Sequence, residues 1–475
     1  MEFYDREEEL ALLEEFDRKR PSFIVLTGRR RVGKTAILRR LIEGKRALYL
    51  YVDDRKGREV QLSEFTAIAR ERLGLPDHTR FDTLSGLLRY LVEEAGDVIV
   101  AIDEFQRLQR TDPPLMTELQ DIWDGRPKGS GAYLLASGSS MGMMRRVFLD
   151  TGAPLFKRAD NIITVRPFTM AGAFEMMAGL GIKDLGERLD LFCLFGGMAY
   201  YYAMMERYGA TSRREAMDRL VLDEMAPLRN EVRDVMVEEF GREHPTYFEI
   251  LSALAQGKCT KKEIGDLTHV EATSLSPYLS DLIDLLGLVE HVVPATERRE
   301  RTKKGRYRVK DSFFRFYFTF IYPNASLYEI GARDRLRGLI EEGWGAFRGR
   351  AFETAAIDSL RPSLVEEYPV VGPYWDRKGN ELDLVAIDLG RKRMLVAEVK
   401  STRLSRKEAS RVLDEVRERA GIVPFEAERT DLGVVAVAVD GRAALEREGH
   451  RVWELGDLLA AGRGARPHEA QGRRD

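Results

Sequence analysis

The sequence has few of the residues from which disulfide frameworks and zinc sites are built. Its 475 residues include two cysteines, Cys193 and Cys259, which lie far apart and form no C-x-x-C motif. The histidines His244, His269 and His291 are isolated and are not paired at the spacing of metal ligands. This composition argues against a disulfide scaffold and against a zinc site, and it favours a reducing compartment.

Long apolar segments and an excess of one charge are also missing. Residues 1–10 are acidic and lack the apolar core of a secretory signal, and no run of about 18 apolar residues occurs. Lysine and arginine total 75 against 78 acidic residues, a formal net charge of −3. We therefore expect a cytoplasmic protein without a membrane partner, in which any nucleic-acid binding depends on a local basic patch.

The spacing of the apolar residues predicts several domains. The 475-residue length is about three times the size of a typical domain, and 44 % of the residues are apolar. Residues 1–165 alternate short apolar runs with helical patterns, as is typical of a doubly wound α/β domain with a parallel sheet. The expected strands are residues 22–27, 46–52, 97–102, 132–136 and 161–165.

The middle and the end of the chain have different patterns. Residues 166–240 show helical periodicity, which favours an all-helical subdomain. Residues 241–325 predict three short helices and then a charged strand pair, which is the order of a winged helix. Residues 326–344 are rich in glycine and charge and predict a linker, and residues 461–475 predict a disordered tail.

A glycine-rich loop separates the first expected strand from the following helix. The segment Gly28–Thr35 matches G-x-x-x-x-G-K-[ST], the phosphate-binding motif of P-loop nucleotide hydrolases. Backbone N–H groups of such a loop surround the phosphates, while Lys34 reaches the β and γ oxygens and the Thr35 hydroxyl ligates Mg²⁺. The residues expected to contact ATP are Gly28, Arg29, Arg30, Arg31, Val32, Gly33, Lys34, Thr35 and Ala36.

An acidic strand end supports this nucleotide site. The apolar run 98–102 leads into Asp103 and Glu104. Because ligands of parallel α/β sheets bind beyond the carboxyl ends of the strands, we expect Asp103 to hold Mg²⁺ and Glu104 to polarise the attacking water. Ser139 is a candidate sensor of the γ-phosphate, and Arg158 is a candidate arginine finger in cis or in trans. An ordinary turn and a solvated surface arginine are the alternatives.

Several of these motifs together resemble a known family. The similarity to archaeal-type ATPases of the STAND class, relatives of AAA+ proteins, is carried by Phe3–Leu10, Gly28–Thr35, Ile102–Gln106 and Ser137–Ser140. The resemblance implies that the segment around Arg6 covers the nucleotide base. It also implies that Gly196–Tyr200 begins a lid motif, with Ala199 where the family usually has proline. Members of this family often carry a nuclease-like C-terminal domain.

The C-terminal part of the chain contains carboxylates on an expected strand pair, residues 380–387 and 393–400. Because strand side chains alternate, Glu398 and Lys400 share a face, and the hairpin can bring them close to Asp383. Glu353, on the preceding expected helix, can supply a further carboxylate. Carboxylates that hold one or two Mg²⁺ ions beside a lysine are what metal-assisted phosphodiester hydrolysis requires.

This arrangement resembles the PD-(D/E)xK restriction-endonuclease-like fold. Asp383, Glu398 and Lys400 match its aspartate and its E-x-K strand, and Glu353 matches its helical acid. The resemblance implies metal binding by Glu353, Asp383 and Glu398, and catalysis by Asp383, Glu398 and Lys400. A solvated edge hairpin and a fold retained for binding alone are the other interpretations.

The charged segment of the expected winged helix concentrates positive charge. Eight basic residues stand against two acidic ones between Glu297 and Lys310, which suits contacts to nucleic-acid phosphates. Asp281 and Asp284 on the third expected helix keep a protein-binding role open. The residues expected to bind DNA are Arg298, Arg299, Arg301, Lys303, Lys304 and Arg306.

These features together predict an α/β multidomain protein that binds and hydrolyses Mg²⁺·ATP and acts on DNA. The nucleotide-controlled output is either DNA cleavage or, with an inert C-terminal domain, binding of DNA or protein. A homo-oligomer is also expected to be possible. The expected boundaries are 1–165 for a P-loop ATPase core, 166–240 for a helical lid, 241–325 for a winged helix, 326–344 for a linker, 345–460 for a nuclease-like domain and 461–475 for a tail.

Overall fold

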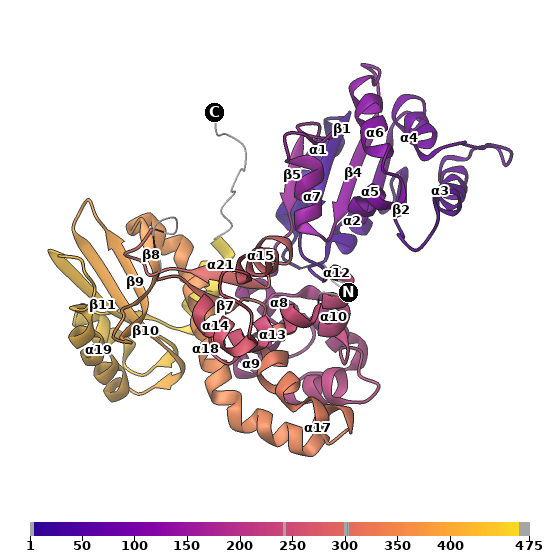
Figure 1. Cartoon of the computed structure of the whole chain (residues 1–475). Helices are drawn as coiled ribbons and strands as arrows, with labels where there is room; N and C mark the ends of the chain where they lie inside the picture. The colour runs from indigo at the N-terminus through magenta and orange to yellow at the C-terminus, as the bar shows by residue number, and fades with distance from the viewer. Residues whose placement is uncertain (1–3, 241–243, 299–301, 303, 465–475) are drawn as a thin grey trace. The chain divides into compact units, whose positions relative to one another are not determined.

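The computed structural model describes residues 4–240, 244–298, 302 and 304–464, and it divides the chain into two compact units (Figure 1). The first unit contains Met1–Pro167, Met198–Tyr200 and Ser280–Gly287. The second contains Phe168–Gly197, Tyr201–Leu279 and Leu288–Asp475. Within the described residues, the structure has no helix that is long and apolar enough to cross a membrane.

The first unit is built around a parallel five-stranded sheet, which confirms the expected α/β class. The register places Thr27 of β1 beside Gly138 of β4 and Thr164 of β5, so that the carboxyl ends of these strands meet at one edge. The strands, in their spatial order, are β2 (Ala47–Tyr51), β3 (Val98–Asp103), β4 (Ala132–Gly138), β1 (Ser22–Thr27) and β5 (Asn161–Thr164).

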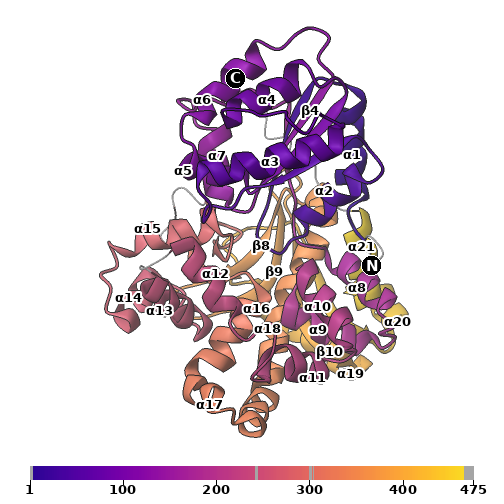
Figure 2. The same cartoon turned by 90° about the vertical axis from the view of Figure 1, so that its right-hand side faces the viewer.

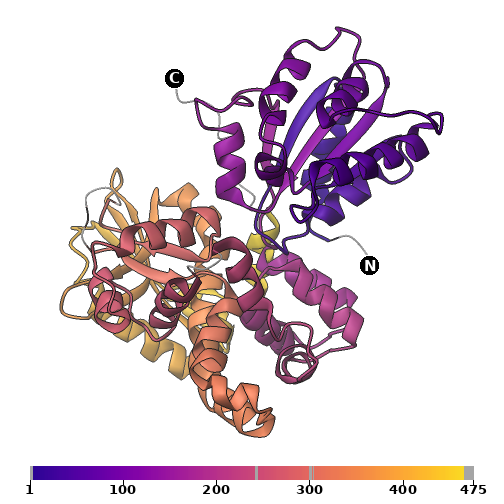
Figure 3. The same cartoon turned by 45° about the vertical axis from the view of Figure 1, so that its right-hand side comes forward.

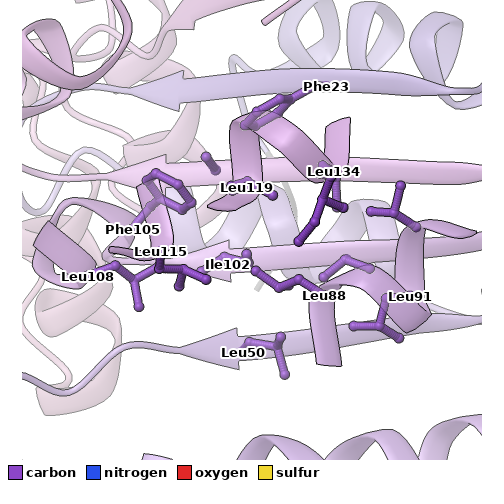
Figure 4. Packing of buried hydrophobic residues seen from close by; sticks show 14 of the residues in the cluster. Phe23, Leu50, Leu88, Leu91, Ile102, Phe105, Leu108, Leu115, Leu119 and Leu134 are labelled. Carbon is purple, nitrogen blue, oxygen red and sulfur yellow. The ribbon is translucent and has the colours of Figure 1, made fainter. Parts of the chain in front are cut away.

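Helices cover this sheet, and β1, β3 and β4 are buried along their whole length (Figure 3). Alternate strand residues such as Leu50, Ile102 and Leu134 form a core with Leu88 and Leu119 from two of the helices (Figure 4). The helices of this unit are α1 (Glu7–Arg18), α2 (Lys34–Ile42), α3 (Arg58–Leu73), α4 (Leu84–Glu93), α5 (Leu108–Thr111), α6 (Leu115–Asp124) and α7 (Met141–Phe148).

The second unit begins with a helical part. Its helices are α8 (Met170–Gly179), α9 (Leu185–Phe195), α10 (Ala199–Tyr208), α11 (Arg213–Ala216), the π-helical η2 (Met217–Leu222) and α12 (Glu231–Phe240). After residues 241–243, which the structure does not describe, come α13 (His244–Ala255), α14 (Lys261–Thr268) and α15 (Leu275–Ser280). The next element, the π-helical η4 (Asp281–Leu285), belongs to the first unit. The antiparallel strands β6 (Val289–Val292) and β7 (Arg306–Val309) follow.

One helix of 35 residues, α18 (Arg333–Glu367), follows α16 (Ser312–Phe316) and α17 (Ala325–Glu329). Residues 326–344 therefore lie largely in α17 and α18, where the sequence predicts a linker. Gly343 explains the difference, because a Cβ atom there would lie 2.6 Å from the Phe320 ring. The glycine permits close packing of a helix against an aromatic ring, and it does not break the helix.

The C-terminal part is a mixed five-stranded sheet in the order β12-β11-β10-β9-β8. Figure 2 labels β8, β9 and β10 of this sheet. β8 and β9, and β9 and β10, pair antiparallel, whereas β10, β11 and β12 pair parallel. The elements are β8 (Val370–Trp375), β9 (Glu381–Asp388), β10 (Arg393–Leu404), α19 (Arg406–Ala420), β11 (Arg429–Val439), α20 (Arg442–Arg447), β12 (Arg451–Trp453) and α21 (Leu455–Gly464). Of the expected tail, residues 461–464 lie in α21, and 465–475 lie outside the described residues.

Candidate functional site

The glycine-rich loop connects β1 to α2 and has a backbone that other residues cannot adopt. Gly28 has a φ of +153°, and a Cβ atom there would lie 2.4 Å from the carbonyl oxygen of Val165. Gly33 has a φ of +108° and stands immediately before α2. Both glycines therefore hold the loop against the helix N-terminus, the geometry in which backbone N–H groups bind phosphate. On the same loop, Val32 is buried, Arg29, Arg30 and Arg31 are half-buried and Ala36 is exposed.

Lys34 and Thr35 form the polar end of this loop. The buried Lys34 amine donates to the carbonyl oxygens of Gly28 at 2.7 Å and of Arg29 at 3.0 Å. The Thr35 hydroxyl donates to Oδ2 of Asp103 at 2.8 Å. The structure thus brings the loop hydroxyl and the acidic strand end together, and the pair has the oxygen ligands that Mg²⁺ prefers.

Tyr49, on the neighbouring strand β2, is a site residue that the sequence did not indicate. Its hydroxyl donates to the same Asp103 oxygen at 2.7 Å. Burial, followed by the negative charge of Asp103 and this hydrogen bond, raises the pKa of Tyr49, so the hydroxyl remains a donor. Tyr49 pairs in register with Ala101, and only the strand order reveals that it lies beside Asp103.

Glu104 has a constrained backbone and a fixed carboxylate. Its φ of +57° is in the left-handed region, which is uncommon for a residue with a side chain. Its Oε2 accepts hydrogen bonds from Gln106 Nε2 at 2.7 Å and from the Ser139 hydroxyl at 2.8 Å. Glu104 and Ser139, which are far apart in sequence, therefore meet at the carboxyl edge of the sheet.

Arg6 and Arg31 connect the loop to more distant segments of the first unit. The Arg6 guanidinium is buried and donates to the carbonyl oxygens of Val32 at 3.0 Å and Arg166 at 2.9 Å, and burial lowers its pKa. The Arg31 guanidinium lies 3.9 Å from the centre of the Tyr200 ring, and the Tyr200 N–H donates to the Arg31 carbonyl at 3.3 Å. The segment around Tyr200 thus contacts the phosphate loop directly.

Arg158 lies at the wrong edge of the sheet for a finger acting on its own chain. It precedes β5, whose amino end lies beside the start of β1, as the bond from Asp160 N to Phe23 O shows. The nucleotide loop follows the opposite, carboxyl end of β1. Arg158 instead forms an ion pair with Asp124 of α6 at 3.0 Å. This placement corrects the cis interpretation and leaves Arg158 as a trans candidate only.

The C-terminal carboxylates come from adjacent strands. The Val399 N–H donates to Oδ2 of Asp383 at 2.8 Å, which joins β9 to β10 at this point. Glu398 is bracketed by two cations, since its Oε1 lies 3.0 Å from Lys400 Nζ and its Oε2 lies 3.2 Å from Arg419 Nη2. Arg419, from α19, was not among the predicted site residues, because nothing in its local sequence connects it to β10.

Like charges crowd at this point of the second unit. Burial, followed by the charges of Glu353 and Glu398, raises the pKa of Asp383 to about 7. Burial also raises the pKa of Glu353, with a further contribution from Glu381 and Glu398. Such crowding is relieved when a cation binds, so the donor set suits a divalent metal.

The predicted metal ligands nevertheless do not form a three-residue cluster. In the part of the chain that the structure describes, no group of three or more histidine, cysteine, aspartate or glutamate side chains is arranged to hold a metal ion. Both oxygens of Glu398 are instead engaged by cations, Lys400 and Arg419. Among the described residues, Glu353, Asp383 and Glu398 are therefore not arranged as the three-ligand metal site that the sequence predicts.

The predicted DNA-binding residues lie on the basic hairpin, which we define as residues 289–309. Arg299, Arg301 and Lys303 lie outside the described residues. Arg298 is exposed, Lys304 forms an ion pair with Glu297, and Arg306 forms an ion pair with Glu381. Of the three described residues that were predicted to bind DNA, two are thus engaged by acidic side chains of the same chain.

Comparisons with known proteins find families that are similar to two segments of the chain. Residues 3–201 match a family described as an ATPase domain predominantly from Archaea. Residues 317–412, which include Asp383, Glu398 and Lys400, match a family of archaeal and bacterial proteins of unknown function. Residues 3–201 are thus similar to an archaeal-type ATPase domain, and this match ends directly after Tyr200.

Two similar proteins match this chain over most of their own length. The uncharacterized protein MJECL04 of Methanocaldococcus jannaschii is 29 % identical over 447 residues, which cover 93 % of this chain and 97 % of that protein. A Walker-type ATPase of Pyrococcus abyssi is 21 % identical with a TM-score of 0.52, and the match covers 66 % of this chain and 96 % of that one. The second likeness shows a shared P-loop ATPase fold.

Proposed function

We propose that this chain is a Mg²⁺·ATP-dependent switch ATPase of the STAND class, whose nucleotide state controls DNA binding by a winged helix and metal-dependent DNA cleavage by the C-terminal domain. The observation that carries the ATPase part is the hydrogen bond between Thr35 and Asp103 at 2.8 Å, beside a buried Lys34. The oxygens that would hold Mg²⁺ and the amine that would bind phosphate thus come from one edge of the sheet.

Residues of the loop and of the end of β3 would each act on a different part of the reaction. Lys34 would transfer its hydrogen bonds from the carbonyls of Gly28 and Arg29 to the β and γ oxygens. Thr35 and Asp103 would hold Mg²⁺, which supplies charge neutralisation at the phosphates when it is bound. Glu104, oriented by Ser139 and Gln106, would accept a proton from the attacking water.

Phosphate release from ATP tests this assignment. Glu104→Gln keeps the shape of the side chain and removes the proton acceptor, so we expect ATP binding to persist and turnover to fall about 100-fold or more. Arg40→Ala, which removes an exposed partner of Glu43 on α2, is the matched control and should change neither. Turnover by Glu104→Gln at the wild-type rate would contradict the proposed role of Glu104.

The element order of the C-terminal domain supports the nuclease-like interpretation. A helix, α18, precedes three antiparallel strands, and α19 then connects β10 to the parallel strand β11. This order and the positions of Asp383, Glu398 and Lys400 resemble the PD-(D/E)xK fold. In this proposal Asp383 and Glu398, with Glu353 nearby, would hold Mg²⁺, and Lys400 would orient the water that attacks the phosphodiester.

A second candidate function has an observation of its own. Both oxygens of Glu398 are engaged by cations, Lys400 and Arg419, which favours a domain that binds without cleaving. Salt-dependent retention of DNA that survives Asp383→Ala, without any cleavage, would support this inert form.

Three further points also remain proposals: the cytoplasmic location, the homo-oligomer and an action of Arg158 in trans.

A further inference from the structure

Several cations around the C-terminal carboxylates are neutralised by acidic side chains. Lys400 and Arg419 both pair with Glu398, at 3.0 and 3.2 Å. Arg348 of α18 pairs with Asp190 at 2.6 Å. A phosphodiester that approached these carboxylates would therefore need positive charge from other residues.

Arg315 of α16 is a cation without such a partner. In the part of the chain that the structure describes, no carboxylate pairs with its guanidinium, and its buried Nε has no hydrogen-bond acceptor. The guanidinium carbon lies 5.4 Å from the centre of the Phe347 ring on α18. Because an arginine stays charged, this buried N–H remains unsatisfied unless a ligand supplies an acceptor.

Arg315 also lies close to other positive charges. Burial lowers its pKa and the charges of Arg308 and Arg350 lower it further, while Cys193 and Asp311 act in the opposite direction. Arg350 is exposed, and it too has no carboxylate partner among the described residues. Guanidinium groups that lie near one another without carboxylate partners repel, and an anion bound beside them would relieve the repulsion.

The contact between α16 and α18 places both arginines near the carboxylates; Figure 2 labels both helices. Phe347, Arg350 and Glu353 follow one another on α18 at intervals of three residues, so they lie on successive turns. Burial raises the pKa of Glu353, and the positive charge of Arg315 is one of those that lower it. Arg315 thus acts on the helical carboxylate of the proposed site.

The same stretch of α18 contacts the strand that carries Lys400. The Arg348 guanidinium donates to the carbonyl oxygen of Ser401, which follows Lys400 on β10. A Cβ atom at Gly349 would lie 3.9 Å from the Ser401 hydroxyl oxygen. Arg350 therefore follows directly on the residues that join α18 to the E-x-K strand.

We infer that Arg315 and Arg350 form a binding site for a phosphate group of the nucleic-acid backbone, beside the carboxylates Glu353 and Asp383. The inference rests on the proposed action of the C-terminal domain on DNA, and it adds residues that would hold the substrate. A guanidinium offers paired N–H donors that match two oxygens of a phosphodiester. Its charge would also offset the repulsion between the phosphate and the carboxylates.

Arg350→Ala is the main test variant, and Arg335→Ala is its matched control. Both arginines are exposed on α18, and neither has a carboxylate partner among the described residues. Arg335 lies near the amino end of the helix, whereas Arg350 lies one turn before Glu353. The two variants therefore lose the same charge at different distances from the carboxylates.

Binding of a labelled double-stranded DNA to the full chain is measured at several salt concentrations, with Ca²⁺ and again in EDTA, and the DNA is checked to be intact. We expect Arg350→Ala to bind about tenfold more weakly than Arg335→Ala, with a log–log salt slope smaller by about one. Equal binding by the two variants would overturn the phosphate site and leave the proposed DNA binding intact. Absence of binding by the wild type in both conditions would overturn the proposed DNA binding, and the phosphate site with it.

Arg315→Lys tests the half-buried arginine. It keeps the charge and loses the planar pair of donors, so we expect the DNA affinity to fall several-fold while the salt slope stays as in the wild type. Thermal unfolding is measured beside it. Unchanged affinity, with or without a loss of thermal stability, would show that Arg315 serves packing alone and would contradict its place in the site. The exposed Arg350→Ala keeps the inference testable if Arg315→Lys does not fold.

Discussion

The nucleotide site of the first unit and the carboxylate site of the second satisfy their polar groups in different ways. Asp103 accepts bonds from Thr35 and Tyr49, both neutral hydroxyls. Asp383 is crowded by Glu353 and Glu398, which raise its pKa after burial has done so. The first site is thus stable without its ligand, whereas the second retains a repulsion that a cation would relieve.

The largest effect is expected when the Lys34 amine is removed from the nucleotide site. Lys34→Ala removes the group that would neutralise the β and γ oxygens, and we expect ATP turnover to fall about 100-fold or more. Arg30→Ala, a change on the same loop away from the motif's fixed positions, is the control and should lose far less. Similar losses for both variants would show that general loop charge, and not Lys34, binds the phosphates.

The next prediction compares Asp383 and Asp103, each replaced by asparagine. The ordinary pKa of an aspartate is 3.8, whereas the pKa of Asp383 in the folded chain is about 7. Between these two pH values, folded Asp383 holds a proton that the unfolded chain has released. The free energy of unfolding therefore falls as the pH rises through this range. In EDTA, Asp383→Asn should remove this loss and stabilise the second unit at pH 8 by about 2 kcal/mol relative to wild type. At pH 5 the difference should be smaller.

Asp103→Asn should act in the opposite direction in the first unit. It weakens two hydrogen bonds to a charged acceptor, and we expect a loss of about 1 kcal/mol. Hydrogen exchange of peptides from β9 and from β1 during urea titration measures the two units separately. If both asparagine variants shifted stability in the same direction, the contrast between the sites would be wrong.

A smaller effect tests Tyr49 as a positioning residue. Tyr49→Phe removes one of the two hydroxyls that hold Oδ2 of Asp103, a contribution of about 1 kcal/mol. We expect the Mg²⁺ concentration for half-maximal ATP turnover to rise about fivefold, while ATP binding without metal stays unchanged. A purely structural role would instead change thermal stability and leave the Mg²⁺ dependence as it is.

The smallest effect concerns two glycines of α18. Gly338→Ala meets no atom within 4 Å and should stabilise the helix by about 0.5–1 kcal/mol. Gly343→Ala should destabilise it, since its Cβ would lie 2.6 Å from the Phe320 ring. Urea unfolding of the two variants distinguishes these outcomes, and equal shifts would contradict the packing role of Gly343.

The sequence predicts those features that are local. The phosphate loop is contiguous, so its glycines, Lys34 and Thr35 are recognised directly as a phosphate-binding motif. The expected parallel sheet is confirmed for the same reason, because each strand is a short apolar run. The basic hairpin shows the limit, since its positive charge is visible in sequence but the pairing of Arg306 with Glu381 depends on a tertiary contact.

Features that depend on strand order could not be predicted in this way. Tyr49 reaches Asp103 because β2 lies beside β3, and Arg158 is remote from the loop because it precedes a parallel strand. Gly343 was interpreted as part of a linker because glycine alone does not reveal a ring packed against it. In each case the missing information is which residues lie side by side across the sheet or between helices.

Cleavage of labelled DNA by the purified full chain tests the central claim most directly. The reaction is followed with Mg²⁺ or Mn²⁺, with and without ATP, for the wild type, Lys34→Ala and Asp383→Ala. We predict metal-dependent cleavage that Asp383→Ala abolishes and whose response to ATP is lost in Lys34→Ala. ATP hydrolysis by the wild type without any cleavage would contradict the nuclease assignment and leave a nucleotide-controlled binding protein.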